Sequence, residues 1–285
     1  MPEVHRVAFD GPATLYVEEF GRAHAGAAPR PGHEHRGAVV FGHSLLCDGR
    51  IFSDQVTDLA QDHHVLNLDF RGHGRSDPPP RSYTLADVAT DYLRAMDALS
   101  VERATLVGLS MGGMAALLLA LSHPERVAGL VLIDTSASAE RPHNRARQLA
   151  LATTARLFGP RPWLVRQATA LLFGATFRAQ HPDEVAVWEQ RIAALNRAGL
   201  ARGVAAVAGR RDVTARLPDI VAPTLVIVGD EDTATPPVYA RTLAAAVPHA
   251  RLEVLPATGH LASVERPRVV AKLIRQFLTG RATPG

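Results

Sequence analysis

The sequence predicts an α/β protein, in which helices flank a mostly parallel central sheet and further helices form an inserted cap. From residue 37 onward, short apolar runs rich in β-branched residues alternate with helical stretches. These runs are nearly continuous in apolar character, which is typical of strands covered on both faces. The alternation stops at residues 138–217, where no convincing strand occurs, and then resumes.

The first part of the chain supplies most of the predicted sheet. The stretches Val4–Phe9 and Thr14–Phe20 are expected to form an antiparallel edge. Four further strands are expected at GAVVF (37–41), HVLNLDF (64–70), RATLVGL (103–109) and VAGLVLID (127–134). Helices are expected between them at residues 51–61, 85–99 and 111–122. This order predicts parallel strands joined by helical crossovers.

Residues 138–217 are expected to form the cap, and the residues after them are expected to complete the sheet and its helices. Residues 138–217 are rich in Ala, Leu and Arg, and an insert of this kind must lie outside the sheet, most simply over its carboxyl edge. Its aromatic residues either shape a pocket or pack one helix on another: Trp163, Phe173, Phe177 and Trp188. PTLVIVG (223–229), a helix at 237–247, RLEVLP (251–256) and a helix at 267–278 follow. We therefore expect a core of residues 1–137 and 218–285, with a helical cap at 138–217.

Composition excludes several classes of function. The chain has 285 residues, of which 47% are hydrophobic and 21% charged, as in ordinary globular enzymes. Its 31 basic and 28 acidic residues give a net charge of only +3, and no basic cluster suggests a nucleic-acid partner. The longest apolar run, residues 114–121, is too short to span a bilayer, and the opening MPEVHRVAFDG has no signal core. We expect a cytoplasmic protein that binds neither membrane nor nucleic acid, while the oligomeric state stays open.

The sharpest motif is Gly108-Leu109-Ser110-Met111-Gly112, which lies between an expected strand and an expected helix. This is the GxSxG pattern of a nucleophile elbow in the context that the elbow requires. A serine on such a turn is held exposed in a strained backbone conformation, and a Cβ at either flanking glycine would collide with a neighbouring element. We expect Ser110 to be a nucleophile.

A serine hydroxyl needs a base and a third group that orients the base. His260 follows RLEVLP, and Asp232 follows PTLVIVG, so the chain order Ser110, Asp232, His260 agrees with the elbow pattern. Asp134, which ends an earlier strand, is the main alternative acid. Two neighbouring carboxylates are expected to be loop caps: Asp230 and Glu231.

Hydrolysis also needs donors for the developing oxyanion. The backbone N–H of Met111, at the start of its helix, is one expected donor. The amide of Leu45, in the turn after GAVVF, is the second, although the register could place Ser44 there instead. His43 and Cys47 are expected to have packing or loop roles.

We expect no metal and no cofactor. His33-Glu34-His35 lies in a Gly/Pro-rich loop without a third ligand, and there is no HExxH motif. His63 and His64 are adjacent on an expected strand, so they should point to opposite faces. The single cysteine cannot form an internal disulfide, and no paired CxxC spacing exists to hold zinc or an iron-sulfur cluster.

From about residue 12 to the end, these motifs resemble the α/β-hydrolase superfamily. DFRGHGRSD (69–77) looks like the loop after the family's fourth strand, which implies that Asp69 and Arg71 are structural. GLSMGG, SLLCDGRIF, GDEDTATPP and HLASVERP together resemble the 3-oxoadipate enol-lactonase and small esterase branch. The resemblance implies hydrolysis of a small-molecule ester or lactone without a cofactor.

The chain also departs from that branch. Members usually have Gln-Trp in the helix after the nucleophile, where this chain has MAALLLALSHPERV, and Asn-Ser where it has His43-Ser44. Alternatives are meta-cleavage carbon-carbon hydrolases, which usually have Asn where Leu109 stands, cofactor-free perhydrolases or haloperoxidases, and a ligand receptor with slow turnover. Epoxide hydrolases and haloalkane dehalogenases use an aspartate nucleophile, which Ser110 argues against.

Overall fold

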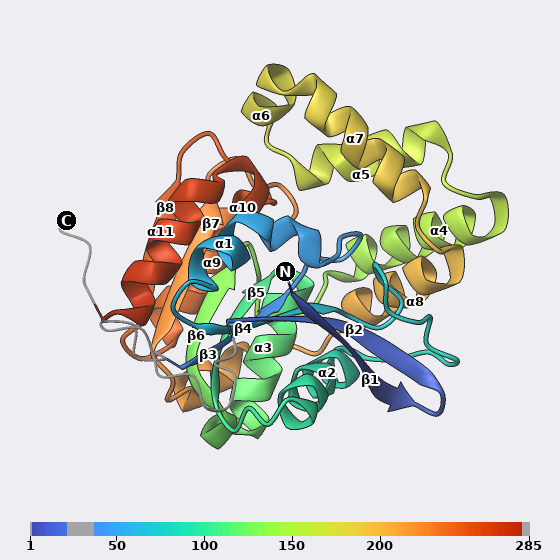
Figure 1. Cartoon of the computed structure of the whole chain (residues 1–285). Coiled ribbons are helices and arrows are strands. Elements are labelled where there is room, and N and C mark those ends of the chain that lie inside the picture. The colour runs from blue at the N-terminus through green and yellow to red at the C-terminus, as the bar shows by residue number, and fades with distance from the viewer. Residues whose placement is uncertain (1, 22–36, 281–285) are drawn as a thin grey trace.

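The computed structural model describes residues 2–21 and 37–280, and it confirms the α/β class. Eight strands form one sheet in the order β1-β2-β4-β3-β5-β6-β7-β8 (Figure 1). β1 and β2 pair antiparallel, β2 pairs antiparallel with β4, and the remaining strands are parallel. The strands are β1 Glu3–Asp10, β2 Ala13–Phe20, β3 Ala38–Gly42, β4 His64–Asp69, β5 Ala104–Leu109, β6 Val127–Ile133, β7 Thr224–Gly229 and β8 Arg251–Leu255.

Helices cover both faces of the sheet, which explains the continuous apolar strands. All residues of β5 and β7 are buried. One face carries α2 (Leu85–Ala98), α3 (Met111–Ser122) and α9 (Pro237–Ala246), and the other carries α1 (Ser53–Leu59) and α11 (Pro267–Leu278). Each face therefore has its own hydrophobic core.

The expected helix at residues 51–61 is divided. A 3₁₀ turn, Gly49–Phe52, precedes α1, which ends at Leu59. The Asp48 side chain accepts a hydrogen bond from the amide of Arg50 (3.0 Å) and so starts the tighter turn. Shorter elements complete the core: the 3₁₀ turns Pro124–Arg126 and Thr214–Asp219, and the helix α10, Ala262–Glu265.

Five helices lie between β6 and β7 and form a separate layer beyond the edge of the sheet (Figure 1). They are α4 Pro142–Phe158, α5 Pro162–Leu172, α6 Ala175–Gln180, α7 Pro182–Ala193 and α8 Arg197–Ala208. α4, α5 and α7 begin with proline, whose fixed φ favours the first helical position. We refer to these five helices as the cap.

The cap has its own aromatic cluster. The rings of Phe173 and Phe177 stack at 5.2 Å between centroids, and Trp188 lies 5.9 Å from Phe173. All three are buried, whereas Trp163 is half exposed. These aromatics were expected either to shape a pocket or to pack one helix on another. The contacts of Phe173, Phe177 and Trp188 show that these three pack cap helices together.

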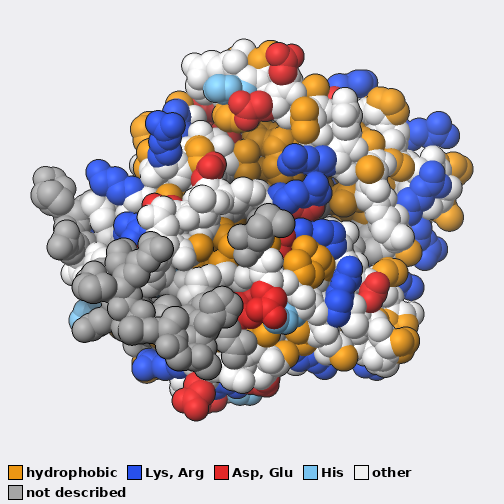
Figure 2. Space-filling view, in the orientation of Figure 1, with side chains coloured by type: hydrophobic (Ala, Val, Ile, Leu, Met, Phe, Trp, Pro, Cys, Tyr) orange, Lys and Arg blue, Asp and Glu red, His pale blue; other side chains and the backbone are white. Residues whose placement is uncertain are grey.

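Figure 2 shows hydrophobic, basic and acidic side chains interspersed over one face of the molecule. None of the described helices combines the length and the apolar character that a membrane span requires.

Candidate active site

The carboxyl ends of the parallel strands bring distant parts of the chain together. Gly42, the last residue of β3, pairs in register with Gly108 in β5, and Leu109 pairs with Ile133 at the end of β6. Gly229, the last residue of β7, is in register with the end of β8. The segments that leave these strands therefore meet at one edge of the sheet, where ligand sites of such folds lie.

Ser110 connects β5 to α3 through a strained turn. Its φ of 52° and ψ of −110° lie in a region that L-residues rarely adopt, and its amide donates to the carbonyl of Ile133 at 2.9 Å. A Cβ on Gly112 would lie 2.0 Å from the carbonyl oxygen that ends β3. A Cβ on Gly108 would lie 2.4 Å from a backbone nitrogen of α3. Both glycines are therefore needed for the close approach of strand and helix.

His260 and Asp232 are joined by a buried hydrogen bond. His260 Nδ1 lies 2.9 Å from Asp232 Oδ2. Thr235 donates its hydroxyl to the same Oδ2 (2.8 Å), and the amides of Ala234 and Thr235 donate to Oδ1 at 2.8 and 2.9 Å. Burial raises the pKa of Asp232, but the charge of His260 and these hydrogen bonds outweigh it and hold the pKa below its ordinary value.

Asp134, the alternative acid, has different partners. Its Oδ1 accepts from the amide of Gly229 (2.9 Å) and its Oδ2 from the amide of Ala262 (3.2 Å). Burial, followed by the charge of Asp232, raises the pKa of Asp134 well above its ordinary value. Asp134 thus connects three segments of the site, and it is Asp232 that bonds to His260.

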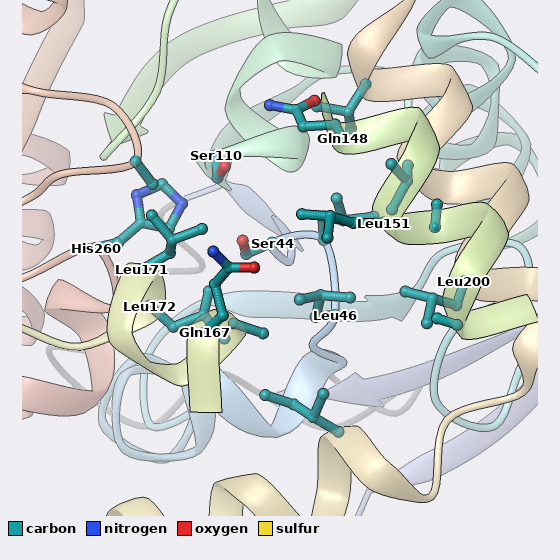
Figure 3. A pocket seen from close by; sticks show the side chains of 18 of the residues that line it. Ser44, Leu46, Ser110, Gln148, Leu151, Gln167, Leu171, Leu172, Leu200 and His260 are labelled. Atoms are coloured by element: carbon teal, nitrogen blue, oxygen red, sulfur yellow. The ribbon is translucent and has the colours of Figure 1, made fainter. Parts of the chain in front are cut away.

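Ser110 and His260 line the same pocket, which has a volume of about 240 Å³. Figure 3 shows both side chains at one end of this pocket, with Leu151 and Leu200 of the cap at the other end. The Ser110 hydroxyl is not hydrogen-bonded to His260 in this structure. Such contacts are often long in the absence of substrate and shorten when it binds.

The two amides expected to bind an oxyanion belong to Met111, which follows Ser110 in the chain, and to Leu45, which lines the same pocket as Ser110. Within the described residues, neither the amide of Leu45 nor that of Met111 donates to a backbone carbonyl. Leu45 and Ser44 line the pocket, whereas Met111, the first residue of α3, has a side chain that is buried in the hydrophobic core. The partial positive charge of a helix amino terminus favours an anion at this point.

The remaining residues expected near the site have structural contacts. Asp69 accepts from the amides of Gly49 (2.8 Å) and Arg75 (2.9 Å), and Arg71 forms a buried ion pair with Asp91. His43 lies between the Ser44 carbonyl (2.8 Å) and the amide of Phe70 (2.9 Å). Further contacts agree with loop roles for two acidic residues: Asp230 accepts from the Thr258 amide, and Glu231 binds Thr176 of the cap.

Two supporting residues were missed from the sequence. Thr235 fixes Asp232 through hydrogen bonds from its amide and its hydroxyl. The signal that could have revealed this role is the pattern Asp-x-x-Thr, because an aspartate side chain often accepts hydrogen bonds from residues two and three positions later. Glu265 accepts from the amides of Gly259 (2.8 Å) and Gly174 (3.2 Å), so it joins the loop of His260 to the cap. No motif in the sequence indicates this second role.

The described residues contain one group that could hold a metal ion. Glu3, His5 and Glu19 bring their ligand atoms within 4.8 Å of one another on β1 and β2, strands that supply no residue to the pocket. His64 also contacts Glu19, at 2.7 Å, whereas His63 contacts Asp62. The string His33-Glu34-His35 lies outside the described residues.

Known proteins are similar to this chain over most of its length. The sequence is 31% identical over 238 residues to 3-oxoadipate enol-lactonase 2 of Acinetobacter baylyi, covering 83% of this chain and 86% of that protein. It is 34% identical over 252 residues to a Variovorax paradoxus protein named "Putative carbamate hydrolase RutD", covering 87% and 94%. A thermophilic esterase from Thermogutta terrifontis superposes with a TM-score of 0.87 at 27% identity, covering 98% of each chain.

A family model described as the alpha/beta hydrolase fold matches residues 37–267, which include every element from β3 to α10. The resemblance expected from the elbow and from the strand-end motifs is therefore confirmed. This chain belongs to the alpha/beta hydrolase fold family.

Proposed function

We propose that the protein is a serine hydrolase that cleaves a carboxylic ester or lactone of a small molecule through an acyl-enzyme. The observation that carries this proposal is the buried Asp232–His260 hydrogen bond at 2.9 Å, formed beside a strained serine that lines the same pocket. A serine with an oriented histidine is the arrangement that activates a hydroxyl at neutral pH. This chemistry uses no metal and no cofactor.

The reaction has two steps. Ser110 Oγ attacks the substrate carbonyl carbon while His260 Nε2 takes its proton, and the carbonyl oxygen becomes an oxyanion. The amides of Met111 and Leu45 donate to that oxyanion. The tetrahedral intermediate then expels the alcohol oxygen, which takes the proton from His260. In the second step, water loses a proton to His260 and attacks the acyl carbon. The tetrahedral intermediate then expels Ser110 Oγ, which takes that proton back from His260, and the acid is released.

Asp232 has a positioning role in this scheme. It accepts the Nδ1–H of His260, so Nε2 is left without a proton and faces the pocket as the base. Its lowered pKa keeps it charged when His260 becomes positive. Thr235 and the Ala234 amide hold the carboxylate in the required orientation.

The relatives support the substrate class. The enol-lactonase and the esterase that resemble this chain are named for the two bond types proposed, and the protein named as a carbamate hydrolase adds a related carbonyl bond to the substrate panel. The panel would contain p-nitrophenyl esters, lactones, carbamates and meta-cleavage dienoates.

Replacement of the nucleophile tests the mechanism. Ser110→Ala should leave the fold intact and lower kcat by about 10⁴ to 10⁶-fold, since the triad acts as a unit. A fluorophosphonate probe should label the wild type and not the variant. A variant that keeps a tenth of wild-type activity would refute the covalent mechanism.

A further inference from the structure

The charge inside the pocket is balanced in a way that bears on the substrate. Apart from His260, the charged residues among those that line the pocket are Glu140, which precedes α4, and Arg210, which follows α8. Their side chains are paired, with Arg210 Nη1 3.0 Å from Glu140 Oε2. The side chains are only 9% and 12% exposed, so solvent screens the pair weakly.

Besides Glu140, Arg210 has two backbone partners, so Nε and Nη1 are both bound by the protein. Its Nε donates to the Ser138 carbonyl at 2.8 Å, and Nη1 also donates to the Val207 carbonyl at 3.1 Å. Glu140 accepts in addition from Gln148 at 3.1 Å. Although burial raises the pKa of Glu140, the charge of Arg210 and these hydrogen bonds hold it below its ordinary value. Glu140 is therefore an anion at neutral pH, and it neutralises Arg210.

The rest of the pocket is mainly apolar. Leucines from the loop after β3 and from the cap surround the space in front of Ser110 (Figure 3): Leu46, Leu151, Leu171, Leu172 and Leu200. Polar groups come from Gln148 and Gln167 and from the catalytic end. A bound acyl chain would exchange water for hydrocarbon over most of its length.

We infer that the substrate carries an uncharged, apolar acyl group, and that the Glu140–Arg210 pair makes the pocket reject acyl groups that end in a carboxylate. This inference rests on the proposed function. A carboxylate at the end of the acyl group would lose its hydration among the leucines and would be repelled by Glu140. The nearby Arg210 is already paired with Glu140. Burial of a charge without a free partner is unfavourable, even where an arginine lies nearby.

The experiment compares two esters that differ only at the end of the chain. p-Nitrophenyl hexanoate ends in a methyl group, and mono-p-nitrophenyl adipate carries a carboxylate at the same position. At pH 7.5 we expect kcat/KM for the hexanoate to exceed that for the adipate by at least about 100-fold, after correction for spontaneous hydrolysis. A ratio within about three-fold of unity would overturn the inference.

Chain length gives a second measurement on the wild type. Each methylene that enters an apolar pocket should raise kcat/KM about four-fold, so butanoate, pentanoate and hexanoate esters should form a rising series. A flat series would contradict an apolar acyl site.

Two variants separate charge from size. Glu140→Gln leaves the charge of Arg210 uncompensated, and it should lower the hexanoate to adipate ratio at least ten-fold. Arg210→Gln removes the cation and should not lower that ratio. Asp219→Asn is the matched control, because it also removes the carboxylate of an arginine pair, but on the surface (Arg216–Asp219, 3.2 Å). It should leave both rates unchanged.

The outcomes are distinguishable. Equal decreases of the ratio in Glu140→Gln and Arg210→Gln would mean that a looser pocket, not charge, admits the adipate, and would overturn the inference. If Glu140→Gln fails to fold, as judged by circular dichroism, the wild-type ratio alone decides. Hydrolysis of neither ester, together with no labelling of Ser110, would overturn the proposed function. Hydrolysis of both esters at similar rates would overturn the substrate inference alone.

Discussion

Exchange of Asp232 for asparagine should invert the proton arrangement at His260. In the wild type, Oδ1 accepts from the amides of Ala234 and Thr235, and Oδ2 accepts from His260 Nδ1. An asparagine that keeps its oxygen on the two amides must turn its NH₂ group toward His260. Nδ1 then becomes an acceptor, and the proton moves to Nε2, where it prevents His260 from taking the proton of Ser110.

The opposite orientation of the amide group is less favourable. It would keep an oxygen on His260, but it would place an NH₂ group against two backbone N–H groups and lose both hydrogen bonds, each worth about 1 kcal/mol. The wrong tautomer therefore dominates, and we expect kcat to fall by about 10⁴-fold with little change in KM. Initial rates of p-nitrophenyl butanoate hydrolysis at pH 7.5 measure the loss.

Asp134→Asn is the matched control for this prediction. Its carboxylate serves the amides of Gly229 and Ala262, so the variant leaves one of them without an acceptor. We expect a loss of about 1–3 kcal/mol in the free energy of unfolding, and a decrease of less than ten-fold in kcat. If Asp232→Asn keeps more than 1% of wild-type kcat, or if Asp134→Asn is the more damaging change, the assignment of the acid is wrong.

Two further predictions concern protons and metals. Burial, then the neighbouring His43, lowers the pKa of His73 to about 4, so the folded state binds fewer protons than the unfolded chain between pH 6.5 and 4. The free energy of unfolding of the wild type should therefore fall as the pH drops through this window. Measured by urea unfolding, the decrease between pH 7 and pH 4 should be about 3 kcal/mol smaller in His73→Phe than in the wild type. Esterase activity should survive exhaustive dialysis against EDTA; loss on chelation and recovery with one added metal would contradict the mechanism.

The sequence predicts the core well because two strong signals act together. Strands such as β5 are apolar on both faces, and helices follow them at regular intervals, so their parallel arrangement has few alternatives. The elbow motif depends on local backbone geometry, and for that reason GxSxG between a strand and a helix already locates Ser110. Parallel strands end at one edge, which brings Asp232 and His260 to the same place.

The choice between Asp232 and Asp134 depends on a fact that the sequence does not contain. Both follow parallel strands, and both are buried in the structure. Their difference lies in which donors face them: backbone amides of β7 and α10 surround Asp134, while an imidazole reaches Asp232. Which donors reach each carboxylate depends on the path of the loops after the strands, and hydrophobic periodicity does not predict that path.

The cap was the least predictable part, and it is the part that determines what the pocket accepts. Its helices could be foreseen from composition, but the pairing of Glu140 with Arg210 joins residues that are separated in sequence by all five cap helices. From the sequence, any cap arginine could have been a receptor for a carboxylate. In the folded chain, Arg210 is the arginine that lines the pocket, and its charge is neutralised by Glu140. The rest of the pocket in front of Ser110 is lined mainly by apolar side chains. On the proposals made above, a contact between the two segments that flank the cap helices sets the charge of the substrate, whereas the strand ends of the core set the bond that is broken.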